Sequence, residues 1–321
     1  MTIQANSPHA RDIAYHLHPY TDLAAHQDQG PHIFERGEGI HVIDDSGKRY
    51  IEGLAGLWCA SLGFSERRLA EAAAGQLGKL PYYHNFAHKT TEPVIDLAER
   101  LVAMAPGAMS KVFFTNSGSE ANDTQVKLVW YYNNALGRPQ KKKIIARQGA
   151  YHGVTVASAS LTGLAYVHNA FDLPIEGILH AECPHQYHHG LDGEGEEDFA
   201  SRLAGNLEKL IVEEGADTIG AFIAEPVIAA GGVVPPPKTY FAKIQEVLKR
   251  HDVLFIADEV VCGFGRTANM FGCETYSIKP DMVTLAKALS SGYQPIGAVL
   301  ISDEVYRGLV EGAAKHGVFG T

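Results

Sequence analysis

Short apolar runs alternate with helix-like segments from about residue 65 to the end of the 321-residue chain. Residues 92–104 (EPVIDLAERLVAM) have apolar side chains at helical spacing, and residues 111–116 (KVFFTN) follow as a strand. Strands that are apolar on both faces and separated by helices indicate a parallel sheet. We therefore expect an α/β fold with a mainly parallel central sheet and helices on both faces. The same pattern predicts helices at 119–136 and 239–251, and strands at 142–148, 217–226 and 252–260.

The N-terminal part has a different pattern. Residues 41–53 (HVIDDSGKRYIEG) consist of two strand-like runs around Asp45-Ser46-Gly47, which predicts a hairpin. At roughly 150 residues per domain, the chain length suggests about two domains. We expect an N-terminal arm and part of a small domain at 1–64, and a large α/β domain at 65–321.

Composition excludes several classes of protein. The formal net charge is -10, and no basic cluster suggests a nucleic-acid partner. No apolar run approaches the roughly 20 residues that a membrane-spanning helix needs, and the polar start is unlike a secretory signal. The four cysteines contain no CxxC pair, which is typical of a reducing compartment. We expect a cytoplasmic protein with no membrane partner.

A strand, a turn of small residues and a helix follow one another in KVFFTNSGSEAND, residues 111–123. Ser117, Gly118 and Ser119 form the turn, and free N–H groups at a helix start can hold a phosphate. The alternative is a plain capping turn, because serine is common before any helix. The spacing is not that of a P-loop.

Two carboxylates end the apolar strand in DVLFIADEVVCGFG, residues 252–265. A buried carboxylate is costly unless a cationic group pairs with it. Asp258 would be suited to a protonated pyridine nitrogen, which keeps a cofactor ring electron-withdrawing. The alternative is a structural carboxylate paired with an arginine or a backbone amide. Metal binding is less favoured, because Asp258 and Glu259 point to opposite faces of a strand.

Two other segments carry candidate side chains. Tyr151 and His152 follow a predicted strand, where an aromatic ring can stack on a flat ligand, although ordinary packing is the alternative. Residues 180–190 (HAECPHQYHHG) bring Cys183 close to four histidines in the sequence. No second cysteine pair follows and there is no HExxH helix, so we expect a surface loop rather than a metal site.

Lys287 lies among small and apolar neighbours in TLAKALSSG, residues 284–292. It is either a surface lysine or an amine in a dry pocket, where it would lose its proton and attack an aldehyde more readily. A lysine nucleophile, a phosphate turn and a strand-end carboxylate would each bind one group of pyridoxal phosphate. The three together therefore predict that cofactor better than any one of them does.

Several motifs resemble the signature segments of class III aminotransferases, which are pyridoxal 5′-phosphate-dependent enzymes of fold type I. The motifs are TNSGSEAND, AYHG, AEPV, LFIADEVVCGFGRT and PDMVTLAKALSSGYQPIGAV. HPYTD and GLAGLWCASLGF resemble the ω-transaminase branch, which transfers amino groups between amines or ω-amino acids and pyruvate. The resemblance runs from about residue 18 to residue 320.

The resemblance implies a role for each matching residue. Lys287 would be the Schiff-base lysine and proton shuttle, and Asp258 would pair with the pyridine nitrogen. Val260 would pack on the ring face opposite Tyr151, and Glu225 would orient the hydrogen bonds near the phenolic oxygen. The implied cofactor-binding residues are Ser117, Gly118, Ser119, Tyr151, His152, Glu225, Asp258, Val260, Lys287 and Thr321.

The resemblance also implies a substrate pocket and an assembly. The family is expected to form a homodimer with the active site at the interface, and Phe86 would come from the neighbouring subunit. A C-terminal small domain, with an arginine for the substrate carboxylate, would lie beyond residue 321. Thr321 matches the place of a threonine that reaches the partner's phosphate. The implied pocket residues are Tyr20, Leu57, Trp58, Phe86, Tyr151 and Ala230.

The expected reaction is a ping-pong transamination between an amine or ω-amino acid and a keto acid such as pyruvate. A racemase or decarboxylase on the same fold would use the same lysine, aspartate and phosphate turn. An inactive protein that keeps the fold is a further alternative. A nicotinamide dehydrogenase is disfavoured, because no GxGxxG follows a predicted strand.

Overall fold

The computed structural model describes residues 4–321, which divide into two compact units. The described part of the N-terminal unit is residues 4–76, and the sheet unit comprises residues 77–321. Helix α4 (Arg67–Lys79) begins in the N-terminal unit and ends in the sheet unit. The expected domain boundary after residue 64 stays a prediction.

The N-terminal unit contains a three-stranded antiparallel sheet in the order β1-β2-β3. The predicted hairpin is confirmed, with Val42 opposite Tyr50. In its turn, the Asp44 carboxylate accepts hydrogen bonds from the backbone N–H groups of Ser46 and Lys48, at 3.0 and 2.9 Å. The other elements of this unit are α1 (Pro8–Tyr15), α2 (Leu23–Gln29), β1 (Phe34–Glu38), β2 (His41–Asp44), β3 (Arg49–Ile51) and α3 (Ala55–Trp58).

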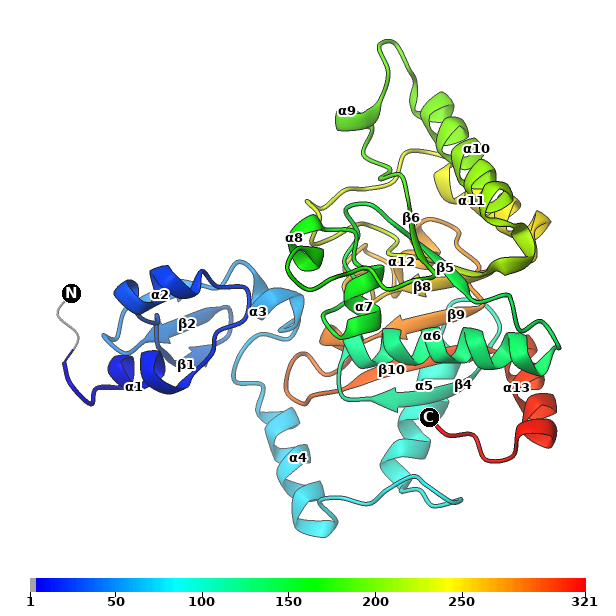
Figure 1. The fold of residues 1–321 in the computed structure, drawn as a ribbon. Helices are drawn as coiled ribbons and strands as arrows, with labels where there is room; N and C mark the ends of the chain where they lie inside the picture. The colour runs from blue at the N-terminus through cyan, green and yellow to red at the C-terminus, as the bar shows by residue number, and fades with distance from the viewer. Residues whose placement is uncertain (1–3) are drawn as a thin grey trace. The chain divides into compact units, whose positions relative to one another are not determined.

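The sheet unit is built on seven strands in the order β4-β10-β9-β8-β7-β5-β6 (Figure 1). The pairs from β9 to β6 are parallel, whereas β10 is antiparallel to both of its neighbours. The expected, mainly parallel α/β sheet is therefore confirmed. The strands are β4 (Met109–Thr115), β5 (Lys143–Arg147), β6 (Ile178–Ala181), β7 (Ile219–Ala224), β8 (Leu254–Asp258), β9 (Met282–Leu285) and β10 (Gly297–Ser302).

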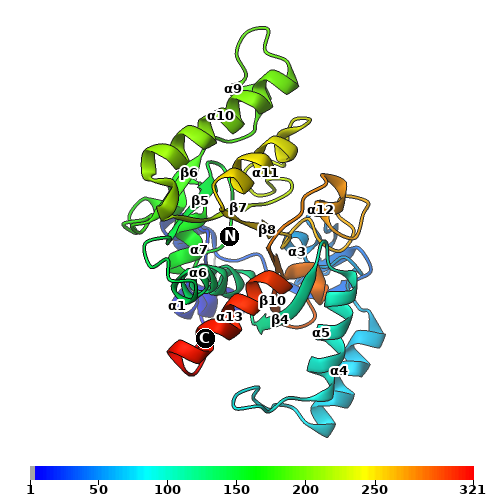
Figure 2. The same ribbon diagram turned by 90° about the vertical axis from the view of Figure 1, so that its right-hand side faces the viewer.

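Helices cover both faces of this sheet, with α6, α7 and α13 on one side and α5, α10 and α11 on the other (Figure 2). The helix expected at 92–104 has those same bounds in the structure. The helices and turns are α5 (Glu92–Met104), α6 (Gly118–Ala135), α7 (Val156–Leu161), α8 (Ala165–His168), α9 (Gln186–His189), α10 (Glu196–Glu214), η1 (Ala216–Thr218), α11 (Tyr240–Arg250), α12 (Gly272–Thr275), η2 (Lys287–Leu289) and α13 (Asp303–His316).

Successive strand residues enter two separate cores. Phe255 and Ala257 pack in the core under α10 and α11, whereas Ile256, between them, packs in the core under α6. Because side chains alternate across a strand, a sheet with helices on both faces needs apolar residues at every position. This explains why the strands appear in the sequence as continuous apolar runs.

None of the described helices combines the length and the apolar character that crossing a bilayer requires.

The core under α10 and α11 provides a stability test. Phe222 in β7 is fully buried, and its ring centroid lies 5.7 Å from that of Phe255. We expect Phe222→Ala to lower the free energy of unfolding by about 3–5 kcal/mol, because it leaves a cavity in a packed core. Urea denaturation measures this change.

Val212→Ala on α10 is the control. Its side chain is 60% exposed, so the substitution should change the free energy of unfolding by less than about 0.5 kcal/mol. Equal effects in the two variants would contradict this assignment of the core.

Candidate active site

One edge of the sheet collects the predicted site residues of the sheet unit. β4, β5, β7, β8 and β9 run in the same direction, so their carboxyl ends meet at this edge. The ends of these five strands, with the segments that follow them, carry the candidate site residues. These are the turn Ser117–Ser119, Tyr151-His152, Glu225, Asp258 and Lys287. Residues far apart in the sequence therefore reach one place, as the parallel sheet predicts.

Asp258 is the last residue of β8, and its side chain is 3% exposed. Its Oδ2 lies 2.8 Å from the Nδ2 of Asn122 and 2.8 Å from the Nδ1 of His152. Its Oδ1 accepts the N–H of Val260 at 3.0 Å. An amide, an imidazole and a backbone amide thus hold this carboxylate, and each oxygen of a carboxylate can accept more than one hydrogen bond.

His152 lies in the loop after β5, and its buried ring, with 2% exposure, faces Asp258. Its backbone N–H donates to the Oγ1 of Thr162 at 2.9 Å, which fixes the loop. Its Nδ1 faces Asp258, whereas its Nε2 has no hydrogen-bond partner among the described residues. Sequence reasoning placed His152 at the rim of the sheet, and the structure adds the direct contact with Asp258.

Asn122 and Thr284 complete this network and were not predicted from the sequence. The Nδ2 of Asn122 also donates to the carbonyl of His152 at 2.7 Å, and its Oδ1 accepts from the Oγ1 of Thr284 at 2.7 Å. Thr284 in β9 lies opposite Asp258 in the parallel pair. The available signal was position: Asn122 follows Gly118 by one helical turn, so it lies on the same face of α6 as the start of that helix.

Glu225, directly after β7, is also buried, at 3% exposure. Its two carboxylate oxygens accept the N–H groups of Tyr151 and Ala229, at 3.0 and 2.9 Å. Burial raises the pKa of Glu225, and the nearby Asp258 charge acts in the same direction. Glu225 therefore holds the backbone of the Tyr151 loop in place, which is a positioning role.

Glu259 points away from Asp258, as adjacent strand residues should. Its carboxylate accepts the N–H groups of Gly272 and Cys273 at 2.9 and 2.6 Å, at the start of α12. Burial raises the pKa of Glu259. The two neighbouring carboxylates therefore have separate partners and do not form one metal site.

The turn after β4 has the capping arrangement that the sequence left open, while its phosphate-binding role stays a prediction. Ser117 caps α6, because its Oγ accepts the N–H of Glu120 at 3.1 Å. The Oγ of Ser119 accepts the N–H of Val154 at 3.1 Å, which ties the turn to the loop after β5. A Cβ added at Gly118 would lie 3.1 Å from a methyl group of Val260 and 3.4 Å from Ala286. Gly118 thus allows the helix start to approach the segments that follow Asp258 and precede Lys287.

Lys287 begins the short turn η2 directly after β9. The residue is half-buried, which lies between the surface lysine and the amine in a dry pocket that the sequence left open. Its backbone has a φ of +48°, in the left-handed region that non-glycine residues seldom adopt. Within residues 4–321, no hydrogen bond or ion pair holds the ammonium group.

The predicted substrate-pocket residues are divided between the two units. Tyr20, Leu57 and Trp58 belong to the N-terminal unit. Tyr151 and Ala230 belong to the sheet unit, where the backbone at Gly231 packs directly against Gly149 and so brings their two loops together.

Phe86 and Thr321 lie apart from the Asp258 network in an open groove of the sheet unit. Phe86 is 73% exposed, and its ring lies 5.8 Å from that of His84. Thr321 lines the same groove, and its Oγ1 accepts a hydrogen bond from the Nζ of Lys127 at 2.6 Å. Asn116, at the end of the β4 segment, also lines this groove.

The histidine-rich segment 180–190 contains the short helix α9. The His185 and His188 rings stack with centroids 4.3 Å apart, and the Nδ1 of His185 accepts the N–H of His188 at 3.2 Å. Cys183 is buried, and its thiol is free. Local hydrogen bonding therefore accounts for the ring arrangement in this segment.

The arrangement suits a ligand with an aldehyde, a ring nitrogen and a phosphate. Among residues 4–321, the amine of Lys287 has no hydrogen-bond partner, and Oδ1 of Asp258 accepts one N–H, that of Val260. Gly118 and Ser119 offer a helix start free of bulky side chains. The unpartnered Nε2 of His152 also fits a site that is completed by a ligand.

Comparison with known proteins identifies the family of the chain. The family model described as Aminotransferase class-III matches residues 23–320. A protein of Oryza sativa subsp. indica named probable gamma-aminobutyrate transaminase 2, mitochondrial, is 62% identical over 290 residues, which are 90% of this chain and 58% of that protein. Vanillin aminotransferase of Capsicum frutescens is 58% identical over 94% of this chain and 66% of its own length. This chain therefore spans less than two thirds of these relatives.

Solved structures give the same result. The crystal structure of an omega transaminase from Pseudomonas jessenii in complex with PMP has a TM-score of 0.97 and 58% sequence identity. The match covers 98% of this chain and 70% of that one.

The hydrogen bonds of Asn122 can be tested in the chain without any ligand. We expect Asn122→Ala to lower the free energy of unfolding by about 1–3 kcal/mol, because it leaves buried partners on Asp258, His152 and Thr284 unsatisfied. Urea denaturation measures this loss. Asn206→Ala is the control, because Asn206 is exposed and bonds only Glu182 among the described side chains. If Asn122→Ala lowers the free energy of unfolding no more than the control does, the network does not stabilise the fold.

The raised pKa of Glu225 predicts a pH dependence. Between the ordinary glutamate value of 4.5 and the raised folded value, the folded chain binds a proton that the unfolded chain has released. The contribution of Glu225 to stability therefore falls as pH rises through this window. The Glu225→Gln variant has no titrating group at this position. The free energy of unfolding of wild type minus that of the variant should therefore decrease as pH rises from 4.5, and it should level off above the raised pKa of Glu225. Urea denaturation at a series of pH values gives this difference; a flat or increasing difference would contradict the prediction.

Proposed function

The chain belongs to the class-III aminotransferases, a family of pyridoxal-phosphate-dependent enzymes, and from this we propose that it performs transamination. The proposed donor is an amine or ω-amino acid, and the proposed acceptor is a keto acid such as pyruvate. The observation that carries the proposal is the placement of Asp258 and Lys287 at the ends of two adjacent parallel strands, β8 and β9. Ser119, at the start of α6, lies at the same edge.

The proposed cofactor is held by residues of the sheet unit. Gly118 and Ser119 would hold its phosphate, and Asp258 would accept a hydrogen bond from its ring nitrogen. Tyr151 and Val260 would hold the ring, and Glu225 keeps the Tyr151 loop in position. When bound, pyridoxal phosphate supplies an aldehyde that carries the amino group and a ring that delocalises negative charge.

Protein groups then determine how protons move. The amine of Lys287 takes a proton from the substrate carbon and returns it to the carbon that accepts the amino group. Asp258 keeps the ring nitrogen protonated, while Asn122 and His152 keep Asp258 in one orientation. Because these donors are fixed before the substrate arrives, little reorganisation is needed during the reaction.

Within the sheet unit, the residues proposed for substrate choice are Phe86, Tyr151 and Ala230. Two of these three are aromatic and the third is apolar, which suits an amine with an apolar substituent. For Tyr20, Leu57 and Trp58 of the N-terminal unit, a substrate contact stays a prediction from the family resemblance. The rice relative is named as a gamma-aminobutyrate transaminase, which supports an ω-amino acid as donor. We also propose a homodimer, in which the exposed Phe86 contributes to the site of the neighbouring subunit.

Cofactor attachment tests the role of Lys287. Wild-type chain incubated with pyridoxal phosphate should become yellow, and after borohydride treatment the cofactor mass should appear on the peptide that contains Lys287. Lys287→Ala should show neither change, whereas Lys279→Ala, at an exposed position, should behave as wild type. Absorbance spectra and peptide mass spectrometry give both results. Labelling that persists in Lys287→Ala would refute the assignment.

The reaction itself is tested with an amine or γ-aminobutyrate together with pyruvate. Formation of alanine, reduced at least about 10²-fold in Lys287→Ala, would support transamination. Loss of CO₂ or of substrate chirality without alanine would indicate a decarboxylase or racemase instead. Cofactor attachment without any turnover would indicate a protein that retains the fold but not the activity.

A further inference from the structure

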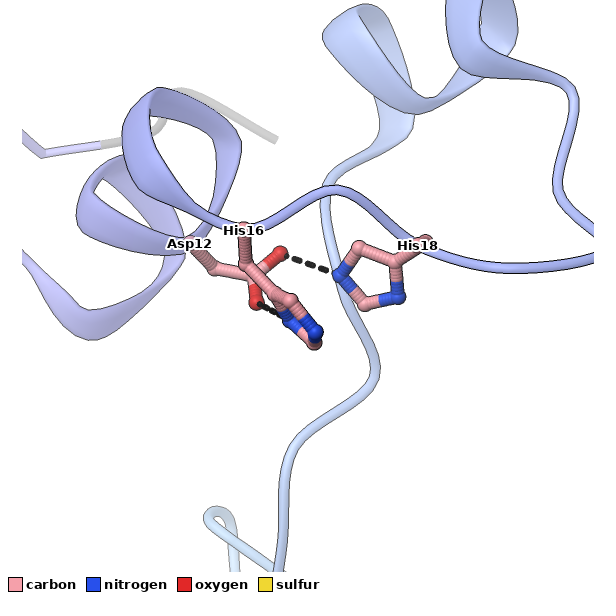
Figure 3. Close-up of side chains that lie close together, drawn as sticks. All are labelled: Asp12, His16 and His18. Carbon is pink, nitrogen blue, oxygen red and sulfur yellow. Dashed lines mark hydrogen bonds and ion pairs between the residues drawn. The ribbon is translucent and has the colours of Figure 1, made fainter. Parts of the chain in front are cut away.

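The N-terminal unit contains a second cluster of reactive side chains, outside the proposed active site. Asp12, His16, His18 and His26, which we call the N-terminal quartet, place three imidazole rings around one carboxylate. Figure 3 shows the rings of His16 and His18 each facing one oxygen of the Asp12 carboxylate. The ligand atoms of these three residues all lie within 4.8 Å of one another.

The nitrogen atoms of the quartet converge on the two carboxylate oxygens. The Nδ1 of His16 lies 3.0 Å from the Oδ1 of Asp12. The Nε2 atoms of His18 and His26 lie 2.8 and 3.1 Å from its Oδ2. The His18 ring lies between the other two, with centroid separations of 4.2 Å to His16 and 4.3 Å to His26.

Local structure produces this convergence within a short stretch of chain. Asp12 lies on α1 and His16 is the C-cap residue of the same helix, so the two are one helical turn apart on one face. His18 follows in the connection, and α2 carries His26. Asp22 caps α2 by accepting the N–H groups of Ala24 and Ala25, which fixes the helix that holds His26.

Burial leaves the quartet closed on one side and open on the other. The side chains of His26 and Asp12 are 8% and 19% exposed, whereas that of His16 is 60% exposed. Burial tends to raise the pKa of Asp12, but hydrogen bonds from His18 and His16 outweigh this effect and the pKa is lowered. The carboxylate therefore stays ionised, and a small cation can reach it past His16.

We propose that the N-terminal quartet binds one divalent transition-metal ion, with Zn²⁺ as the best match. The carboxylate of Asp12 and the imidazoles of His16 and His18 supply three ligands that lie close enough for one ion. His26, which contacts the same carboxylate, would move slightly to supply the fourth ligand of a tetrahedral site. Imidazole with carboxylate suits Zn²⁺ better than Ca²⁺ or Mg²⁺, which prefer oxygen ligands alone. In each neutral ring, the proton that now faces Asp12 would move to the other ring nitrogen, so the coordinating nitrogen gains a free lone pair.

The competing account is a hydrogen-bonded anchor, in which Asp12 simply holds three histidine N–H groups. The two accounts differ in a measurable way, because only the metal site gives the quartet an affinity for Zn²⁺. The chain also contains a natural comparison. His185, His188 and His189 are close in sequence and in space, but among the described residues their ligand atoms do not converge as a group that could hold one ion.

The test uses the 321-residue chain without a histidine tag, after treatment with a chelator. We expect Co²⁺ to bind one ion per chain with the visible absorption of a tetrahedral site, and Zn²⁺ to displace it. Asp12→Asn and His18→Ala should each weaken Zn²⁺ at least about tenfold in competition with a chromophoric chelator. A His188→Ala/His189→Ala double variant should bind as wild type. Zn²⁺ affinity should also fall as pH decreases, because protons compete for the imidazoles.

His16→Ala separates loss of metal binding from loss of folding, because the His16 side chain is mostly exposed and its removal should not unfold the chain. It should retain the far-ultraviolet circular dichroism of wild type while losing the tetrahedral Co²⁺ spectrum. No binding by wild type, or equal binding by wild type and the quartet variants, would overturn the proposal. Binding that disappears only in the His188→Ala/His189→Ala variant would do so as well.

Discussion

The buried carboxylate of Asp258 is the interaction on which the arrangement of the site depends. A charged group this deeply buried costs several kcal/mol unless donors surround it. Its donors come from α6, from the loop after β5 and from the turn after β8. Thr284 then connects the same network to β9, the strand that precedes Lys287. Satisfying one charge thus fixes the relative positions of four segments that are distant in the sequence.

Periodicity in the sequence predicted four of the seven strands, β4, β5, β7 and β8, and the helices α5, α6 and α11, because both cores require apolar residues at regular intervals. It did not predict β6, β9 or β10. It placed Asp258 and Glu225 near strand ends. It did not identify Asn122, since a single polar residue inside a long helix leaves no periodic signal. The N-terminal quartet was missed for a similar reason: its members are spread over residues 12–26, and only the folded connection between α1 and α2 brings them together.

Backbone conformation is the other property that sequence patterns could not supply. Tyr20, Leu57, Trp58 and Lys287 have φ values of 50°, 66°, 62° and 48°, in a region that usually favours glycine. Such conformations cost of order 1–3 kcal/mol each and occur where surrounding structure enforces them, often at functional sites. Propensity would assign Leu57 and Trp58 to an ordinary helix. Four residues chosen from a family resemblance therefore share a strained backbone that the resemblance did not specify.

The antiparallel strand β10 has a consequence for the order in which the chain can fold. In the described sheet, β4 is an edge strand whose one neighbour is β10. Thr115 therefore pairs with Gly297, which lies far later in the sequence. During synthesis, the segment leading into the Ser117–Ser119 turn therefore emerges long before its only neighbouring strand exists. Contacts with such large sequence separation form slowly, and an unpaired apolar edge can associate with other chains. The half of the site that would hold the phosphate is thus assembled last, although its residues are made first.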